Sequence, residues 1–491
     1  MNGLPRTIAA LAAIVVGTTS AVACGTDEPA RPPLAWGACP EEVVAEAAPS
    51  RLDCATVPVP LDHADPASGE IEIMISRLAG PNPEKRRGVL LSNPGGPGGS
   101  GLAFPAFLVA RGMPASVTDS YDVIGIDTRG IGHSAPVECG FTGAGPYVGN
   151  LPPYAVDAAA VTARAEVVRG VAQQCADHDP DDRLRHISTA EMARDLDAIR
   201  AALGEEKASF LGYSYGSALG AAYASMFPDR ADRVVLDSIV GDTHLDRDGM
   251  RRYALGMEQT FPDFAAWAAA RDDTYGLGRT PDEVRAAYLE LADRLDREPV
   301  DGLTGAIFRG SVFAYLFDER QYPVLAGLWQ SLRTGAAPPD TGEVPDLASF
   351  DNSWTVFLAV TCNDVDWPEE VQPYRDAVAE DRERYPLYGA AAANIIPCAY
   401  WPHEPAEPPV PVLADGPANI LLVQNRRDVP TPHRGAELLR AKFGDRARLV
   451  SVDAAGHGAY LLGENPCAND VTTAYLVDGT LPAADVSCPT S

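Results

Sequence analysis

The stretch KASFLGYSYGSALGAAYA, residues 207–224, limits what this chain can fold into more than any other part of the sequence. The apolar run before Gly212 predicts a buried strand, and the small residues after Gly216 predict a helix that packs closely against a sheet. A sharp turn with Ser214 at its centre joins the two. Glycines two positions before and after such a residue relieve crowding at a strained strand-to-helix turn. The stretch therefore predicts a nucleophile elbow that presents Ser214 at the end of a parallel strand.

Strand signals recur along the chain, at residues 70–80, 88–96, 121–130, 233–240, 418–428 and 447–458. Helical patterns alternate with them, as they do in a parallel α/β sheet. Between residues 241 and 412 this alternation stops, and the segments are helical or irregular. The chain of 491 residues also exceeds one ordinary compact core. We therefore expect an α/β fold, with residues 39–240 and 413–491 in one mostly parallel sheet and a large, mainly helical cap at 241–412, after the sixth strand.

The loop NPGGPGGSG, residues 93–101, follows a predicted strand and is rich in glycine. A nucleophile elbow needs a backbone N–H from an earlier strand end to stabilise the oxyanion, and this loop can supply it. A loop of this kind could also hold phosphate, but it lacks the Gly-Lys-Ser/Thr ending of a P-loop. The oxyanion role is the interpretation we favour.

A histidine near the end of the chain is the expected base, because this fold orders its triad as Ser, acid, His. Among eight histidines, His457 follows a predicted buried strand and stands between two glycines in AAGHGAY. Asp428 ends the strand ILLVQNRRD and is the favoured acid. Asp237, at the end of the sixth strand, is a rival because some hydrolases place the acid there. Asp453 lies too close to His457 along the chain to reach back easily.

The first residues have the pattern of an export signal, with one Arg before an apolar stretch and small residues at its end. The apolar stretch is too short to span a bilayer. The segment AVA at 21–23 fits an ordinary signal-peptidase site, whereas Cys24 directly after it also fits a lipoprotein box with lipid on that residue. Residues 1–23 are assigned to the signal and residues 24–38 to a flexible polar tether.

Nine cysteines leave one over in an exported protein. If Cys24 is lipidated or unpaired, the other eight fall into close neighbours, and short loops close at low entropic cost. The simplest pairs are Cys39 with Cys54, Cys139 with Cys175, Cys362 with Cys398, and Cys467 with Cys488. The spacing does not suggest zinc, and we predict no metal and no cofactor.

The formal net charge of −29 argues against a nucleic-acid partner, because no basic stripe is visible. An acidic surface gives solubility and could favour cationic ligands such as a free amino terminus.

The chain resembles the α/β-hydrolase serine peptidases of the proline iminopeptidase group, and more closely the exported tripeptidyl-aminopeptidase-like proteins of actinobacteria. The matching motifs are NPGGPGGSG, YDVIGIDTRGIGHS, GYSYGS, NRRDVPTP and AGHG, with the cysteine contexts WGACP, AVTCNDVDWP, CAYWP and YLVDGTLPAADVSC. The resemblance implies Ser214 as nucleophile, His457 as base and Asp428 as acid. It also implies that the N–H groups of Gly96 and Tyr215 stabilise the oxyanion.

The resemblance further implies a secreted or lipid-anchored exopeptidase that cleaves peptide or protein substrates near their free N-termini. Recognition of an α-ammonium needs a carboxylate, and Asp364 and Asp366 of the cap, next to Cys362, are candidates. An esterase or lipase and an endopeptidase with the same triad are alternatives, as is a binding lipoprotein on the same scaffold. The acids, Trp and Pro of the cap favour polar peptides over lipids.

Overall fold

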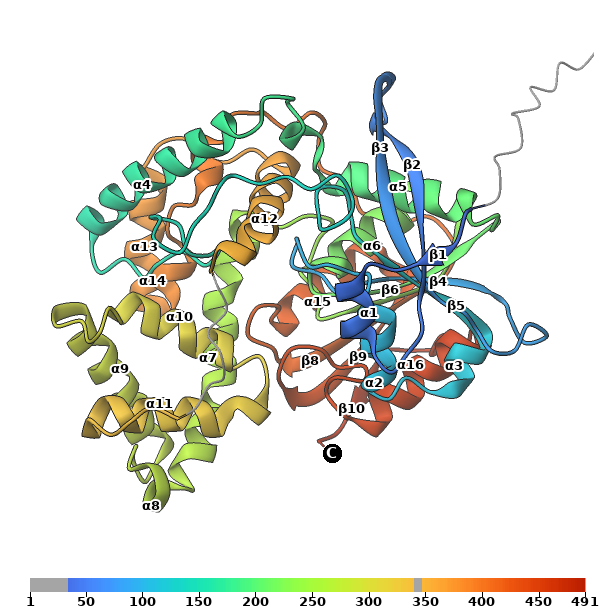
Figure 1. The fold of residues 1–491 in the computed structure, drawn as a ribbon. Coiled ribbons are helices and arrows are strands. Elements are labelled where there is room, and N and C mark those ends of the chain that lie inside the picture. The colour runs from blue at the N-terminus through green and yellow to red at the C-terminus, as the bar shows by residue number, and fades with distance from the viewer. Residues whose placement is uncertain (1–33, 340–346, 491) are drawn as a thin grey trace, which may run out of the picture. The chain divides into compact units, whose positions relative to one another are not determined.

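A computed structural model describes residues 34–339 and 347–490, and its described part centres on one ten-stranded sheet (Figure 1). Its strands lie in the order β1-β2-β3-β5-β4-β6-β7-β8-β9-β10. They are β1 (Gly37–Ala38), β2 (Asp53–Asp62), β3 (Asp65–Leu78), β4 (Gly88–Asn93), β5 (Tyr121–Ile126), β6 (Ala208–Tyr213), β7 (Ala231–Asp237), β8 (Ile420–Arg427), β9 (Ala447–Ala455) and β10 (Val486–Cys488). The pairs β1–β2, β2–β3 and β3–β5 are antiparallel, and all other pairs are parallel.

The central strands are buried on both faces, which explains why they appear in the sequence as continuous apolar runs. Every residue of β4 and of β6 is buried. Alternate side chains of one strand enter different hydrophobic clusters, as Leu90 and Leu91 do. One face packs on α2 (Phe104–Ala110), α3 (Ala115–Ser120) and α16 (Pro466–Asp478), and the other on α5 (Thr189–Ala202), α6 (Tyr215–Met226) and α15 (His433–Phe443). The predicted mostly parallel α/β sheet is confirmed.

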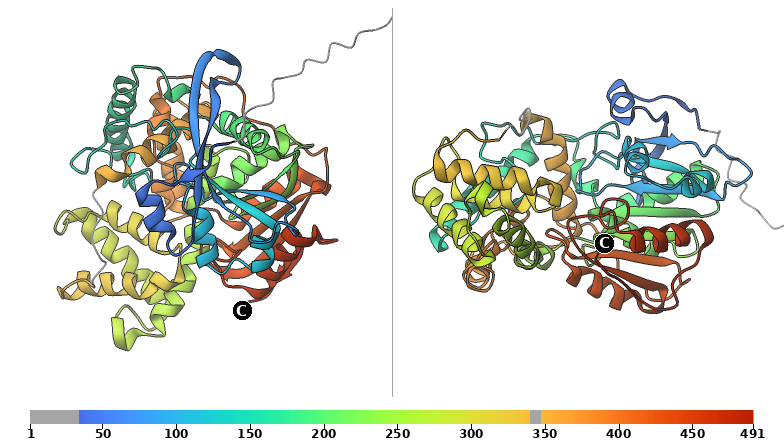
Figure 2. Two further views of the ribbon diagram at one scale, coloured as in Figure 1. Left: turned by 45° about the vertical axis from the view of Figure 1, so that its right-hand side comes forward. Right: turned by 90° about the horizontal axis from the view of Figure 1, so that it is seen from below.

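A helical insertion separates β7 from β8, and β7 is the sixth strand when the two-residue β1 is not counted. Its helices are α7 (Arg247–Ala269), α8 (Asp272–Tyr275), α9 (Pro281–Arg297), α10 (Gly305–Tyr315), α11 (Tyr322–Thr334), α12 (Asp351–Asp364), α13 (Gln372–Arg384) and α14 (Gly389–Ala392). The insertion also contains the short 3-10 turns η2 (Glu319–Gln321), η3 (Leu347–Phe350) and η4 (Pro397–Tyr400). Outside the insertion lie η1 (Leu184–His186), η5 (Gly444–Arg446) and α1 (Glu41–Ala47), which precedes β2. Trp329, fully buried among aromatic rings of α7, α9 and α10, anchors part of the insertion. Figure 2 shows these helices grouped together in two further views.

One helix from the first half of the chain packs with this insertion rather than on the sheet. Helix α4 (Ala158–Asp177) lies beside α13 and η4 (Figure 1), and its side chains Val161, Ala165 and Val168 share a hydrophobic cluster with Tyr374 and Val378. The expected division, which assigned residues 39–240 to the sheet, therefore differs from the packing observed. The apolar stripe of α4 carries no sign of which partner it will cover, so its position depends on tertiary contacts.

The described end of the expected tether, residues 34–38, is part of the folded structure. Gly37 and Ala38 pair with β2, and the Arg77 guanidinium lies 4.1 Å from the ring centre of Trp36. The predicted signal segment, residues 1–23, and the lipidation candidate Cys24 lie outside the described residues.

Four disulfides connect cysteines that are neighbours in sequence, in the pairs that the spacing favoured. They join Cys39 to Cys54, Cys139 to Cys175, Cys362 to Cys398, and Cys467 to Cys488. Disulfides persist in oxidising compartments, so these four fit a protein that works outside the cytosol. Across residues 34–339 and 347–490, none of the helices combines the length and the apolar character that a bilayer crossing requires.

The strand order brings two loops of the sequence motifs side by side. Strand β4 lies between β5 and β6, and Asn93 at its end is in register with Gly212 of β6. The glycine-rich loop that follows β4 and the turn that follows β6 thus leave the same edge of the sheet together. In open α/β sheets this edge, where the strand order reverses, is where ligands bind.

Candidate active site

Ser214 stands between β6 and α6 in a backbone conformation that few residues adopt. Its φ is 57° and its ψ is −124°, and such strain at a strand-to-helix turn typically costs about 1–3 kcal/mol. The flanking glycines are required by close packing. A Cβ on Gly212 would lie 2.3 Å from the carbonyl oxygen of Gly216, and one on Gly216 would lie 2.8 Å from that of Asn93. The turn therefore has the geometry of a nucleophile elbow.

The end of β7 connects this elbow to the loop that carries His457. The Ser214 N–H donates to the carbonyl oxygen of Asp237 at 3.0 Å. The Asp237 carboxylate in turn accepts from the N–H groups of Ala459 (2.9 Å) and Tyr460 (2.7 Å). One residue thus holds the backbone on both sides of the candidate site.

His457 and Asp428 are in direct contact although they follow different strands. His457 Nδ1 lies 3.0 Å from each carboxylate oxygen of Asp428, whose side chain is fully buried. The Thr431 N–H donates to Asp428 Oδ1 at 3.0 Å, and the Thr431 hydroxyl lies 3.2 Å from His457 Nδ1. A proton on Nδ1 satisfies the carboxylate and leaves Nε2 unprotonated, which is the tautomer that a general base requires.

The Asp428 carboxylate also changes the acidity of the imidazole. Burial disfavours the imidazolium, but the adjacent negative charge of Asp428 and the hydrogen bond that His457 donates to it outweigh this effect, so the pKa of His457 is raised above its usual value. This arrangement stabilises the cation that forms when His457 accepts a proton.

The loop around His457 is held by backbone contacts from the sheet and from the insertion. The His457 N–H donates to the carbonyl oxygen of Phe317 at 2.7 Å, and the Asn425 side chain donates to the carbonyl oxygens of Gly456 (2.9 Å) and Gly458 (3.2 Å). The insertion therefore helps to set the position of His457.

The two rival acids occupy other roles. The carboxylate of Asp237 accepts from the backbone N–H groups of Ala459 and Tyr460 and from Ser238 Oγ (3.0 Å). Burial raises its pKa to about 7 although these bonds oppose the shift. Asp453 pairs with Arg427 at 2.5 Å. Of the three candidate acids, only Asp428 is hydrogen-bonded to the imidazole.

The candidate oxyanion donors lie beside Ser214. Gly96 and Tyr215 line the same small cavity as Ser214, together with apolar side chains at the start of the insertion. Tyr215 is the first residue of α6, so its N–H has no acceptor within the helix. Asn93 Oδ1 accepts from the Gly95 N–H at 2.9 Å and shapes the loop. The Asn93 side chain thus supports a loop conformation in which backbone N–H groups can point toward Ser214.

Two larger cavities border His457. They measure about 320 and 300 Å³, and both are lined by His457, Gly458 and Leu462. Glu319 of η2 lines the first, and among the described residues its carboxylate has no hydrogen bond or ion pair. Glu319 is an exposed residue, but partial desolvation of its carboxylate and the nearby carboxylates of Asp263 and Asp318 raise its pKa, although Arg427 opposes the shift. An unpaired carboxylate at this position can pair with a cationic ligand. No sequence motif marks Glu319, so sequence reasoning missed it.

The structure does not bring Asp364 or Asp366 to the cavities that border Ser214 and His457. Asp364, at the end of α12, points inward and accepts from the N–H (2.7 Å) and the hydroxyl (2.5 Å) of Thr189. Asp366 is exposed beyond the helix end. Asp364 borders a separate cavity of about 400 Å³, so the expectation that these two carboxylates meet the substrate's ammonium stays a prediction that the cavities beside Ser214 and His457 do not support.

One group of side chains could hold a cation. Asp179, Asp182 and His403 bring ligand atoms within 4.8 Å of one another. The Asp179 carboxylate already accepts from the N–H groups of Arg183 and Leu184, so it serves the local turn. These residues do not line the cavities beside Ser214 and His457.

The sheet, the elbow after β6 and the insertion after β7 define an α/β hydrolase. Residues 385–488 match the family model described as TAP-like protein. The chain is 35% identical to the tripeptidyl aminopeptidase of Streptomyces coelicolor over 460 residues, which cover 90% of this chain and 83% of that protein. It therefore belongs to the tripeptidyl-aminopeptidase family of α/β-hydrolase serine peptidases, and it is an enzyme.

Two further relatives match nearly the whole chain. The serine protease Hip1 of Mycobacterium tuberculosis is 28% identical over 520 residues, 98% of this chain and 96% of that protein. Carboxylesterase B of the same species is 29% identical over 480 residues, 93% of this chain and 90% of that protein.

Proposed function

We propose that this enzyme is a serine exopeptidase that releases short peptides from free N-termini through an acyl-enzyme. The observation that carries the proposal is the contact of His457 Nδ1 with both oxygens of Asp428 at 3.0 Å, at the edge of the sheet where the strained Ser214 turn also lies. The relative named tripeptidyl aminopeptidase supplies the substrate class.

The residues take the following roles in the proposed reaction. Ser214 Oγ attacks the substrate carbonyl carbon while His457 Nε2 accepts its proton, and Asp428 stabilises the imidazolium. The N–H groups of Gly96 and Tyr215 stabilise the oxyanion. The C–N bond then breaks as His457 returns the proton to the leaving amine. Water, deprotonated by His457, attacks the acyl-enzyme, and the proton passes to Ser214 as the ester bond breaks.

The proposed site for the substrate's ammonium is Glu319. Its carboxylate lines the cavity beside His457 and has no partner within the described residues, whereas the nearby carboxylates of Asp318 and Asp263 are already paired with Arg320 and Arg427. An α-ammonium placed there would gain a charge pair, and the distance from Glu319 to Ser214 would limit how many residues precede the cleaved bond. Glu464 lines the same cavity but lies 3.7 Å from Arg320, so it is the less available acid.

The test compares one tripeptidyl p-nitroanilide with a free N-terminus and its acetylated twin at a single pH. Acetylation removes the cation and should lower kcat/KM by roughly tenfold to 100-fold, a moderate effect because Glu319 is exposed in the free enzyme. Glu319→Gln should weaken cleavage of the free substrate and narrow this gap, whereas the control Glu464→Gln should preserve it. Equal rates on both substrates in the wild-type enzyme would reject the aminopeptidase proposal. A gap that Glu319→Gln leaves unchanged would reject only the role of Glu319.

An esterase is the second candidate function, because the relative named Carboxylesterase B covers nearly the whole chain. The same triad cleaves esters and amides, so p-nitrophenyl esters of different acyl length belong in the same panel. Turnover of esters without turnover of any peptide would favour this candidate. Cleavage of an internal bond in an N-blocked peptide would favour an endopeptidase.

We further propose that the chain is exported and either secreted or anchored through lipid on Cys24. The four disulfides support export. Mass spectrometry of the N-terminal peptide from the native envelope would show a diacylated or triacylated cysteine if the anchor exists. An unmodified N-terminus would reject it. Nucleic acid is not an expected partner.

A further inference from the structure

A chain of three buried side chains connects the insertion to the residue that follows the nucleophile. Asp364 ends α12, Thr189 begins α5, and Tyr215 begins α6. Thr189 Oγ1 lies 2.5 Å from Asp364 Oδ2 and 2.6 Å from the Tyr215 hydroxyl, and the Thr189 N–H donates to Asp364 Oδ1 at 2.7 Å. All three side chains are buried.

The direction of these hydrogen bonds follows from the proton count. Burial raises the pKa of Asp364 to about 7, so above that pH the carboxylate is ionised and can only accept. A threonine hydroxyl has a single proton, so in this state Thr189 donates to Asp364 and accepts from the Tyr215 hydroxyl. A buried tyrosine hydroxyl needs a partner, and its other contact is a weak one with Met192 Sδ at 3.5 Å. Thr189 is thus the principal anchor of the Tyr215 side chain.

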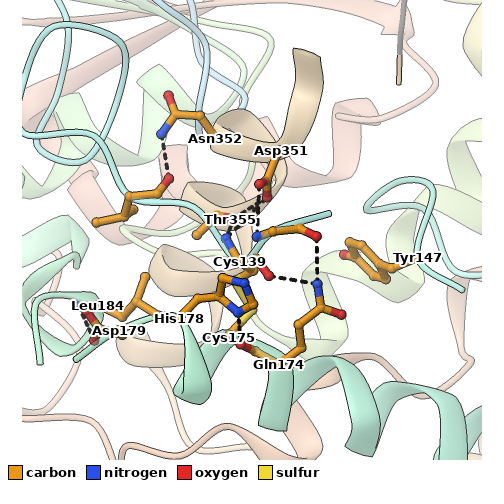
Figure 3. Close-up of a disulfide and its surroundings, with 12 residues drawn as sticks. Cys139, Tyr147, Gln174, Cys175, His178, Asp179, Leu184, Asp351, Asn352 and Thr355 are labelled. Carbon is orange, nitrogen blue, oxygen red and sulfur yellow. Dashed lines mark hydrogen bonds between the residues drawn. A yellow bond between two sulfur atoms is a disulfide. The ribbon is translucent and has the colours of Figure 1, made fainter. Parts of the chain in front are cut away.

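Helix α12, which supplies Asp364, is itself held tightly at its other end. Figure 3 shows Asp351 and Asn352 beside the Cys139–Cys175 disulfide. Asp351 accepts from the N–H groups of Cys139 (3.2 Å) and Gly140 (2.9 Å), and Asn352 Nδ2 donates to the carbonyl oxygens of Gly130 and Val137, both at 2.7 Å. The helix is therefore a fixed support.

The same helix touches the loop that carries the other candidate oxyanion donor. A Cβ on Gly98 would lie 2.4 Å from the carbonyl oxygen of Ser353, so this loop packs directly on the α12 backbone. The loop that contains Gly96 and the side chain of Tyr215 thus both depend on one helix of the insertion.

We propose that Asp364 and Thr189 are positioning residues for the oxyanion hole, which hold Tyr215 so that its N–H points at the developing oxyanion. The inference rests on the role of the Tyr215 N–H in the proposed function. An oxyanion donor acts through its placement, and a displacement of about 1 Å near a reacting centre can cost about 100-fold in rate. Asp364 thereby acts on catalysis from behind Tyr215, without contact with substrate.

The experiment uses three conservative variants of the full chain: Tyr215→Phe, Thr189→Val and Asp364→Asn. Tyr215→Phe is the mildest, because it keeps the backbone N–H and leaves the Thr189–Asp364 pair intact. Two matched controls remove hydroxyls that are buried and unpaired within the described residues, Thr361→Val on α12 and Tyr388→Phe in the insertion. All five are assayed on an amide and on an ester, with Tm measured for each.

The expected result is a kcat about 10- to 100-fold lower in the three variants, with KM within about twofold. The loss should be similar for free peptides, acetylated peptides and esters, because an oxyanion forms on each of them. The inhibition constant of a peptidyl trifluoromethyl ketone, which adds to the serine as a tetrahedral oxyanion, should rise by about the factor by which kcat/KM falls. A double variant of Tyr215 and Asp364 should lose little more than one single variant. Both controls should keep wild-type kcat.

Wild-type kcat in Tyr215→Phe and Asp364→Asn would overturn the inference. So would a rise in KM confined to free N-termini in Asp364→Asn, which would restore this residue as an ammonium ligand. A failure of the proposed function can be told apart from a failure of this inference, because each variant is compared with the wild-type enzyme on whichever substrate that enzyme cleaves. A loss of Tm in Thr189→Val without a loss of kcat in Tyr215→Phe would show that the contact only stabilises the fold.

Discussion

Replacing Asp428 by asparagine is the most direct test of which nitrogen of the His457 imidazole carries the proton. Asp428 is fully buried, and its Oδ1 accepts from the Thr431 N–H at 3.0 Å, whereas the Gln424 side chain is 3.4 Å from Oδ2. The new amide oxygen should keep the stronger bond to Thr431. Its NH₂ group then faces His457 Nδ1, which must accept, so the imidazole proton moves to Nε2. In that tautomer His457 cannot take the proton from Ser214.

The expected loss is about 10⁴-fold in kcat, or about 5 kcal/mol of transition-state stabilisation, with little change in Tm. The pH dependence of kcat/KM should also change. The carboxylate raises the pKa of His457, so wild-type activity should fall, as pH decreases, at a pH above the usual histidine value. Without that charge, the effect of burial dominates and lowers the pKa of His457. The residual activity of the variant should therefore fall at a lower pH than that of the wild-type enzyme.

The assay is kcat and kcat/KM from pH 5 to 9 on one p-nitroanilide, with Asp453→Asn as the control. The Asp453 side chain is 46% exposed and pairs with Arg427, so its variant should stay within about twofold of wild type. Retention of more than about a tenth of wild-type kcat by Asp428→Asn would refute the reasoning. If Asp237→Asn then lost all activity, the acid would be the residue at the end of β7.

Three further predictions concern the nucleophile, the β7 carboxylate and the thiols. Ser214→Ala should lower kcat by about 10⁴-fold or more and abolish labelling by a fluorophosphonate; a labelled variant would show that another residue is the nucleophile. Asp237→Asn should lower Tm by about 2–8 °C, measured by calorimetry, because both carboxylate oxygens accept from Ala459, Tyr460 or Ser238, and the NH₂ group of asparagine would face one of these donors instead. Peptide mapping without reductant should recover the four bridges described above, with Cys24 in none of them; a bridge that contains Cys24 contradicts the anchor proposal.

The sequence by itself was sufficient where the signal is local in the chain. The glycines around Ser214 mark a turn that only small neighbours permit, and the apolar runs mark strands buried on both faces. The rule that parallel strands end at one edge then placed the loops of Asn93, Ser214, Asp428 and His457 together. Each inference needs only residues a few positions apart and one general rule of topology.

Tertiary structure decided everything that depends on which distant surfaces meet. Asp364 is 175 residues from Thr189, and no periodicity indicates that α12 turns it toward α5 rather than toward substrate. Helix α4 has an apolar stripe that would suit the sheet as well as the insertion. Glu319 became a candidate only because no described neighbour pairs with its carboxylate beside His457. Composition and spacing specify what a segment can bury or donate, but the partner is selected by close packing among all segments at once, and that selection exists only in the folded chain.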